Sequence, residues 1–172
     1  MSRKPLVFWA VVLIQIVFLL GWAGYHEWVR QNAPTVLLRP RPVDPRDLLR
    51  GDYMILDYDV RHIALPEGEE VPGPGSLLYV VLEKRGEVHE VAWVSSGTGK
   101  EPEVSPGQVW VRGRVDDVSE PRRVVVSYGI EDYYVPEGRG TPQFERLLVE
   151  AAVSPDHRLY IRQLLLDGKP YP

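Results

Sequence analysis

RPVDPRDLLRGDYMILDYDV, residues 41–60, holds the features that decide the fold. Two prolines stiffen the approach, Gly51 permits a tight turn, and Asp52 can accept hydrogen bonds from backbone donors exposed there. Beyond this corner, alternation predicts a strand over residues 52–60 with its core face formed by Asp52, Met54, Leu56, Tyr58 and Val60. We interpret the stretch as a structural corner where the chain enters the core, and Tyr53, on the other face, as the residue open to a binding surface.

A second decisive stretch lies upstream, between Leu6 and Tyr25, where twenty residues carry no charge. As a helix it would be about 30 Å long, enough to cross the hydrocarbon core of a bilayer. Arg3 and Lys4 precede it, and aromatic rings lie near both ends, as is typical of membrane-spanning helices. A cleavable signal peptide is the alternative, but the apolar run exceeds the usual length of a signal-peptide core.

These features predict a single-pass protein of the cytoplasmic membrane, with the bilayer contacted by residues 6–25. The expected organisation is an anchor at 1–28, a short linker at 29–34 and one domain at 35–172. A short basic N-terminus normally stays in the cytoplasm, so we expect the C-terminal domain on the outer side, although arginines also follow the segment.

The rest of the chain alternates short apolar runs with turn signals, which predicts antiparallel strands. Hairpins are expected at residues 84–87, where Gly86 permits the turn, and at 154–158. Thr141 and Pro142 suggest the start of one short helix over residues 141–150. The predicted fold class is therefore mainly β, with one antiparallel sandwich or barrel-like domain after the transmembrane helix.

Composition excludes several classes of function. Arg3 and Lys4 are the only charged residues before residue 26, so the remainder carries 18 basic and 24 acidic side chains. This acidic balance argues against nucleic-acid binding, which needs a basic surface. The chain has no cysteine, which excludes disulfides, thiolate catalysis and cysteine-based zinc sites.

Motifs that would carry chemistry are incomplete. The glycines at 97–99 lack the rest of a phosphate-binding loop, the four histidines are widely separated, and the aspartates at 44–59 do not follow a calcium-loop spacing. The lysines after the anchor lie in expected turns, which disfavours a Ser-Lys peptidase. The strongest remaining segment is 128–137, where carboxylates sit among tyrosines and would suit acid–base chemistry or sugar binding. No catalytic residue, cofactor or metal is assigned.

Gly51-Asp52-Tyr53-Met54-Ile55-Leu56-Asp57-Tyr58 resembles the string that names the GDYXXLXY protein family. The similarity continues in order through RGRV (112–115), YGIEDYYVPEG (128–138) and LLLDG (164–168). It implies an N-terminally anchored protein, often encoded near multi-pass membrane proteins, with no established activity to carry over. The motif residues expected to matter for interaction are Arg50, Gly51, Asp52, Tyr53, Leu56, Tyr58, Tyr128, Glu131, Tyr133 and Glu137.

We therefore expect a membrane-anchored, non-catalytic accessory domain that works with a multi-pass membrane protein. The alternative is a cell-envelope hydrolase or glycan-binding module that uses segment 128–137. The two hypotheses differ in where Glu131 and Glu137 lie, because the alternative needs one of them in a cleft beside a second carboxylate.

Overall fold

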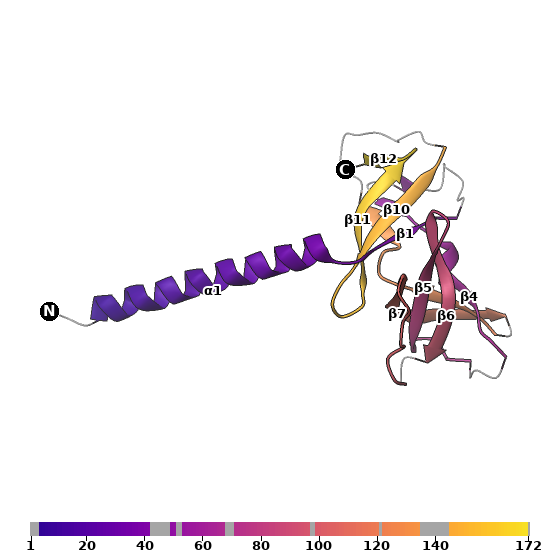
Figure 1. Ribbon diagram of the computed structural model, residues 1–172, viewed down its shortest axis with the longest axis horizontal. Helices are drawn as coiled ribbons and strands as arrows, with labels where there is room; N and C mark the ends of the chain where they lie inside the picture. Colours follow the sequence, from indigo (N-terminus) through magenta and orange to yellow (C-terminus); the bar gives the residue numbers. More distant parts are fainter. Residues whose placement is uncertain are drawn as a thin grey trace. The chain divides into compact units, whose positions relative to one another are not determined.

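The computed structural model describes residues 4–41, 49–50, 53–67, 71–96, 99–120, 122–134 and 145–171. The chain divides into two compact units, Met1–Ala33 and Pro34–Pro172. The first is the helix α1 (Lys4–Asn32), drawn in indigo in Figure 1. It continues through residues 29–32, most of the segment suggested as a polar linker, and Pro34 follows its end. Within it, Val7–Tyr25 is long and apolar enough to cross a membrane, and the chain itself buries none of it.

The second unit is built on a five-stranded antiparallel sheet. Its strand order is β4-β8-β7-β5-β6, with bounds His62–Ala64, Arg123–Ser127, Gln108–Glu120, Leu77–Arg85 and Val88–Ser96. A two-residue loop joins β5 to β6, and Gly86 adopts a φ of 66° there. The predicted hairpin at 84–87 is confirmed, because the turn needs a positive φ that glycine accepts at no steric cost.

A four-stranded antiparallel sheet contains both ends of this unit. Its order is β1-β10-β11-β12, with bounds Thr35–Leu38, Leu147–Val153, Leu159–Leu166 and Lys169–Tyr171. The hairpin expected at 154–158 is confirmed by the hydrogen bond from Ser154 N to Arg158 O, 2.9 Å. The predicted helix at 141–150 is wrong from Leu147 onward, where the chain is strand β10, and residues 141–144 lie outside the described residues.

The corner of the opening motif belongs to a small three-stranded sheet, β2-β3-β9. These strands are Leu49–Arg50, Tyr53–Ile55 and Asp132–Tyr134. The strand expected over 52–60 is shorter than predicted, since a single 3-10 turn, η1 (Asp59–Arg61), follows it. The predicted alternation still holds where side chains are described: Leu56, Tyr58 and Val60 are buried, while Ile55 and Asp59 are exposed.

One hydrophobic cluster joins these sheets and includes Val36, Leu56, Val80, Val126 and Leu164. The two larger sheets also contact each other, through the edge strands β1 and β6 and through the inner strand β7. Leu37 N donates to His89 Nδ1 at 3.0 Å, and Arg112 N donates to His157 O at 2.8 Å. The predicted class is confirmed: the unit is mainly β, antiparallel and barrel-like. Both motif segments, 51–58 and 128–138, therefore contribute described side chains to the same core.

Candidate functional site

The two motif segments, separated by about seventy residues of sequence, are neighbours in the fold. Strand β3 pairs with β9 so that Tyr53 lies opposite Tyr134 and Ile55 opposite Asp132. The ladder continues past the strand, because Leu56 N donates to Glu131 O at 2.7 Å. The predicted interaction residues of segments 53–58 and 128–133 are thus brought together by backbone pairing.

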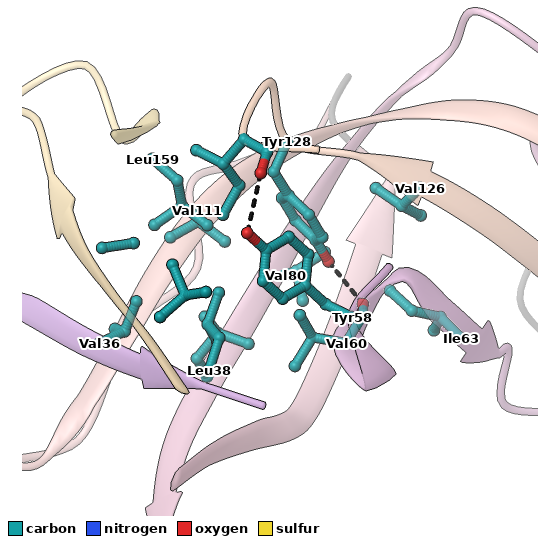
Figure 2. Close-up of a cluster of buried hydrophobic side chains, with 14 of the residues drawn as sticks. Val36, Leu38, Tyr58, Val60, Ile63, Val80, Val111, Val126, Tyr128 and Leu159 are labelled. Atoms are coloured by element: carbon teal, nitrogen blue, oxygen red, sulfur yellow. Dashed lines mark hydrogen bonds between the residues drawn. The ribbon is translucent and has the colours of Figure 1, made fainter. Parts of the chain in front are cut away.

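Two buried tyrosines cross-link these segments, and we call Tyr58 and Tyr128 the tyrosine pair. The Tyr58 hydroxyl donates to Ile130 O, and the Tyr128 hydroxyl donates to Val60 O, each at 2.8 Å. Figure 2 shows the two rings side by side, each hydroxyl reaching the backbone of the other segment. Burial raises the pKa of both phenols, so both remain neutral donors.

Glu131 holds the turn that precedes β9. Its Oε1 accepts a hydrogen bond from Tyr128 N at 2.6 Å, and its Oε2 accepts one from Gly129 N at 2.9 Å. Gly129 has a φ of 81°, a conformation that favours glycine. The carboxylate therefore satisfies backbone donors on both of its oxygens, a role that fixes the turn.

Arg61 is the centre of a charged cluster that connects η1, β7, β8 and the turn before β9. Its Nε donates to Val126 O at 3.1 Å, and its terminal nitrogens bind Asp57 at 3.1 Å and Asp116 at 3.2 Å. Glu131 Oε1 lies 3.8 Å from Arg61 Nε. Only 16% of the Arg61 side chain is exposed, so these contacts are poorly screened by water.

The sequence profile of the GDYXXLXY protein family matches residues 15–164, most of the chain. This chain belongs to the GDYXXLXY family. The match starts inside α1 and ends within β11, so it includes both motif segments and most of the β-rich unit. No curated protein and no solved structure matches the chain.

The described side chains that the GDYXXLXY signature names are buried. Its leucine and final tyrosine, Leu56 and Tyr58, are fully buried. Tyr133 is half-buried and packs against the same cluster. The side chains of Arg50 and Tyr53, and the whole of Gly51, Asp52 and Glu137, lie outside the described residues. The described signature residues lie where segment 53–58 packs against segment 128–133.

Sequence analysis missed the role of Arg61 and its partners in this GDYXXLXY domain. The alternation puts Asp57 on the outer face of the expected strand, with Tyr53, and indicates no interaction for Asp57 or for Arg61. Their spacing of four residues was the available signal, because the turn η1 brings the two side chains together. Asp57 also contacts His62 Nε2 through both oxygens, at 3.0 and 2.9 Å. Among the described residues, no group of three potential ligands is placed to hold a metal ion.

Replacing Arg61 by methionine is expected to lower the free energy of unfolding by about 2–3 kcal/mol, because Asp57 and Glu131 lose their shared cation and Val126 O loses a donor. Chemical denaturation of the full chain in mild detergent measures this loss. Arg41→Met is the matched control, since Arg41 pairs with Asp59 at the exposed surface. It should cost about 0.5 kcal/mol or less. Equal effects of the two substitutions would contradict a central role for Arg61.

Proposed function

We propose that this GDYXXLXY protein is a single-pass, membrane-anchored interaction domain that performs no catalysis and works with a multi-pass membrane protein. Helix α1 crosses the cytoplasmic membrane, and the β-rich domain lies on its outer side. The observation that carries the proposal is the apolar segment Val7–Tyr25, none of which is buried by the part of the chain that the structure describes. An apolar surface of that length needs a cover other than water, and a bilayer supplies it.

The described motif residues support the non-catalytic part of the proposal. Tyr58, Tyr128 and Glu131 each form hydrogen bonds to backbone groups of the domain itself. The two carboxylate oxygens of Glu131 are already occupied by amide donors, which leaves little capacity for acid–base chemistry. The alternative, a hydrolase or glycan-binding module, requires Glu131 or Glu137 in a cleft beside a second carboxylate; Glu131 binds backbone amides, and Glu137 lies outside the described residues.

Co-purification tests the partner. Full-length protein extracted from its native membranes in mild detergent is expected to bring a multi-pass membrane protein with it in stable proportion. The matched control is a chain that keeps α1 and lacks residues 34–172, which should retain the anchor but release the partner if the domain makes the contact. Recovery of the intact protein alone, in repeated mild extractions, would contradict the proposed association.

Membrane orientation can be measured with single cysteines, because the natural chain has none. Glu101 is exposed and Ser2 precedes the helix. In spheroplasts, a membrane-impermeant maleimide is expected to label Glu101→Cys and to leave Ser2→Cys unlabelled until the membrane is opened. The reverse pattern would place the domain in the cytoplasm, and loss of an N-terminal tag from the mature protein would indicate a cleaved signal peptide.

A further inference from the structure

The five-stranded sheet leaves two strand edges facing one gap. Strands β4 and β6 are the outer members of the order β4-β8-β7-β5-β6. Every neighbouring pair in this sheet is antiparallel, so after four reversals β4 and β6 run in the same direction. We call the gap between them the seam. A direct closure of the seam would need a parallel pair, whereas one further strand could run antiparallel to both edges.

Backbone hydrogen-bonding groups on both edges point into the seam. Leu65 N donates to Arg122 O at 2.8 Å, which makes these residues a hydrogen-bonded pair. Alternation along the ladder then turns the backbone N–H and C=O of Ala64 and the C=O of His62 away from β8 and toward the seam, while the His62 N–H donates to Asp59 O in η1. No hydrogen bond of the sheet joins β4 to β6.

The same rule orients the facing edge. The two-residue loop after β5 closes on the pair Arg85 and Val88, which is hydrogen-bonded in such hairpins. The backbone groups of His89 and Val91 therefore face away from β5, on the side of the seam. Leu37 N reaches this strand only through the His89 ring, at 3.0 Å, and leaves the backbone edge itself unpaired.

Two hollows lie along the seam and differ in charge; we call the second the apolar hollow, although Ser76, Ser95 and Ser96 line it together with its apolar residues. The first, of about 450 Å³, lies between β4 and the start of β6 and is lined by five ionisable side chains, Arg39, Asp59, His62, His89 and Glu90. The second, of about 260 Å³, lies between Leu65 and the end of β6 and has no charged residue in its lining. Val71 and Leu77, which line this second hollow, are 39% and 43% exposed. Together the hollows offer a charged end and an apolar end.

We propose that the seam is a strand-addition site for an extended peptide segment of the membrane-protein partner, an inference that rests on the proposed function. The segment adds a sixth strand, antiparallel to both β4 and β6, and its backbone pairs with both edges. In this binding mode main-chain hydrogen bonds give affinity and side-chain pockets give specificity. The described strand edges supply the main-chain hydrogen-bonding groups, and the two hollows supply the side-chain pockets.

Charge and direction define the sequence that fits. Both edge strands run from the charged hollow toward the apolar one. The charged hollow is lined by residues 62–64 and 88–91, and the apolar hollow by the later residues 65 and 94–96. An antiparallel segment therefore enters at the apolar hollow. Its N-terminal half carries apolar side chains against Val71 and Leu77, and its C-terminal half carries charges of both signs that complement Arg39 and Glu90.

The test starts from a displayed library of random peptides about ten residues long, which is enough to span a strand, selected against the full-length protein in mild detergent. The expected consensus is apolar residues followed by charged ones. Ala64→Pro removes a backbone donor that faces the seam, and Val71→Asp places a charge in the apolar hollow. Each should weaken binding of a selected peptide about tenfold or more.

Val104→Asp is the matched control, because Val104 is a valine of similar exposure, 42%, that lines neither hollow. It should leave peptide affinity within about twofold. A reversed consensus, equal effects of Val71→Asp and Val104→Asp, or self-association of the protein through the seam in place of peptide binding would each overturn the proposal. Val71 lies outside the strands, so comparing Val71→Asp with Val104→Asp tests the proposal even if Ala64→Pro does not fold.

Failure of the seam is distinguishable from failure of the proposed function. If a multi-pass protein co-purifies equally well with the wild-type protein and with Val71→Asp, the proposed function stands and the seam proposal is overturned. If seam variants abolish binding of the selected peptides while no membrane protein co-purifies, the seam is supported as a peptide site and the proposed partner is contradicted.

Discussion

Raising the pH from about 9 to about 11.5 is expected to lower the free energy of unfolding by about 4 kcal/mol, through the tyrosine pair alone. Burial raises the pKa of the Tyr58 and Tyr128 phenols well above their ordinary value, and the nearby Glu131 carboxylate adds to the rise. In the unfolded chain both phenols ionise near pH 10, so above that pH the unfolded state binds fewer protons than the folded state. Stability is therefore intact below pH 10 and is lost as the pH rises.

The size of this effect follows from the two groups. Each phenol that stays protonated only in the folded state costs about 1.4 kcal/mol per pH unit above pH 10. Urea denaturation of the full chain at a series of pH values measures the slope, and absorbance near the phenolate band reports ionisation during unfolding.

A double substitution, Tyr58→Phe with Tyr128→Phe, isolates the source of the alkaline sensitivity. At neutral pH it should cost about 1–2 kcal/mol per site, because Ile130 O and Val60 O lose buried donors. Above pH 10 its stability should fall far less steeply than that of the wild-type protein. Tyr134→Phe is the control, since the Tyr134 side chain is 77% exposed and should not change the slope. An unchanged slope in the double variant would rule out the tyrosine pair as the cause.

Local patterns predicted the parts of this fold that local forces determine. The alternation through Leu56, Tyr58 and Val60 predicted which side chains enter the core, even though the chain leaves the strand conformation at η1. Burial there requires only that every second side chain face inward over a few residues. The hairpin at Gly86 was predictable for a similar reason, since the turn depends on one residue with a positive φ.

Residues 147–150 show where local signals fail. Thr141 and Pro142 indicated a helix start, but the run from Leu147 onward is buried on both faces as an inner strand between β1 and β11. Such a strand has a continuous apolar sequence, which periodicity alone does not distinguish from a buried helix. Pairing with β1 and β11 determines that these residues form a strand.

The long-range contacts of the charged cluster were beyond sequence reasoning for a different reason. Arg61 binds Asp116 and the carbonyl of Val126, which are 55 and 65 residues away in the chain. No local spacing records such contacts, because they arise only when β4, β7 and β8 are assembled. The family string predicted that residues 51–58 and 128–138 belong to one domain, but not that Arg61 connects them.

Gly113→Ala is expected to destabilise the domain by about 3 kcal/mol, the upper end for overpacking a core. Gly113 is the glycine of the RGRV segment and lies in β7, opposite Leu78. A Cβ at this position would overlap Val126 Cγ1 and would lie 3.1 Å from Tyr128 Cε1. The missing side chain therefore leaves room for the Val126 methyl group and for the ring of Tyr128, so the packing of the tyrosine pair also depends on the RGRV segment.

Two comparisons make this prediction specific to packing. Gly73→Ala is the matched control, because a Cβ there meets nothing within 4 Å, and it should change stability by about 0.5 kcal/mol or less. Adding Val126→Ala to Gly113→Ala removes the overlapping methyl group. The double variant should then be more stable than the sum of the two single losses predicts, as expected for contacting residues. Strict additivity would mean that the overlap with the Val126 methyl group is not the reason for the glycine.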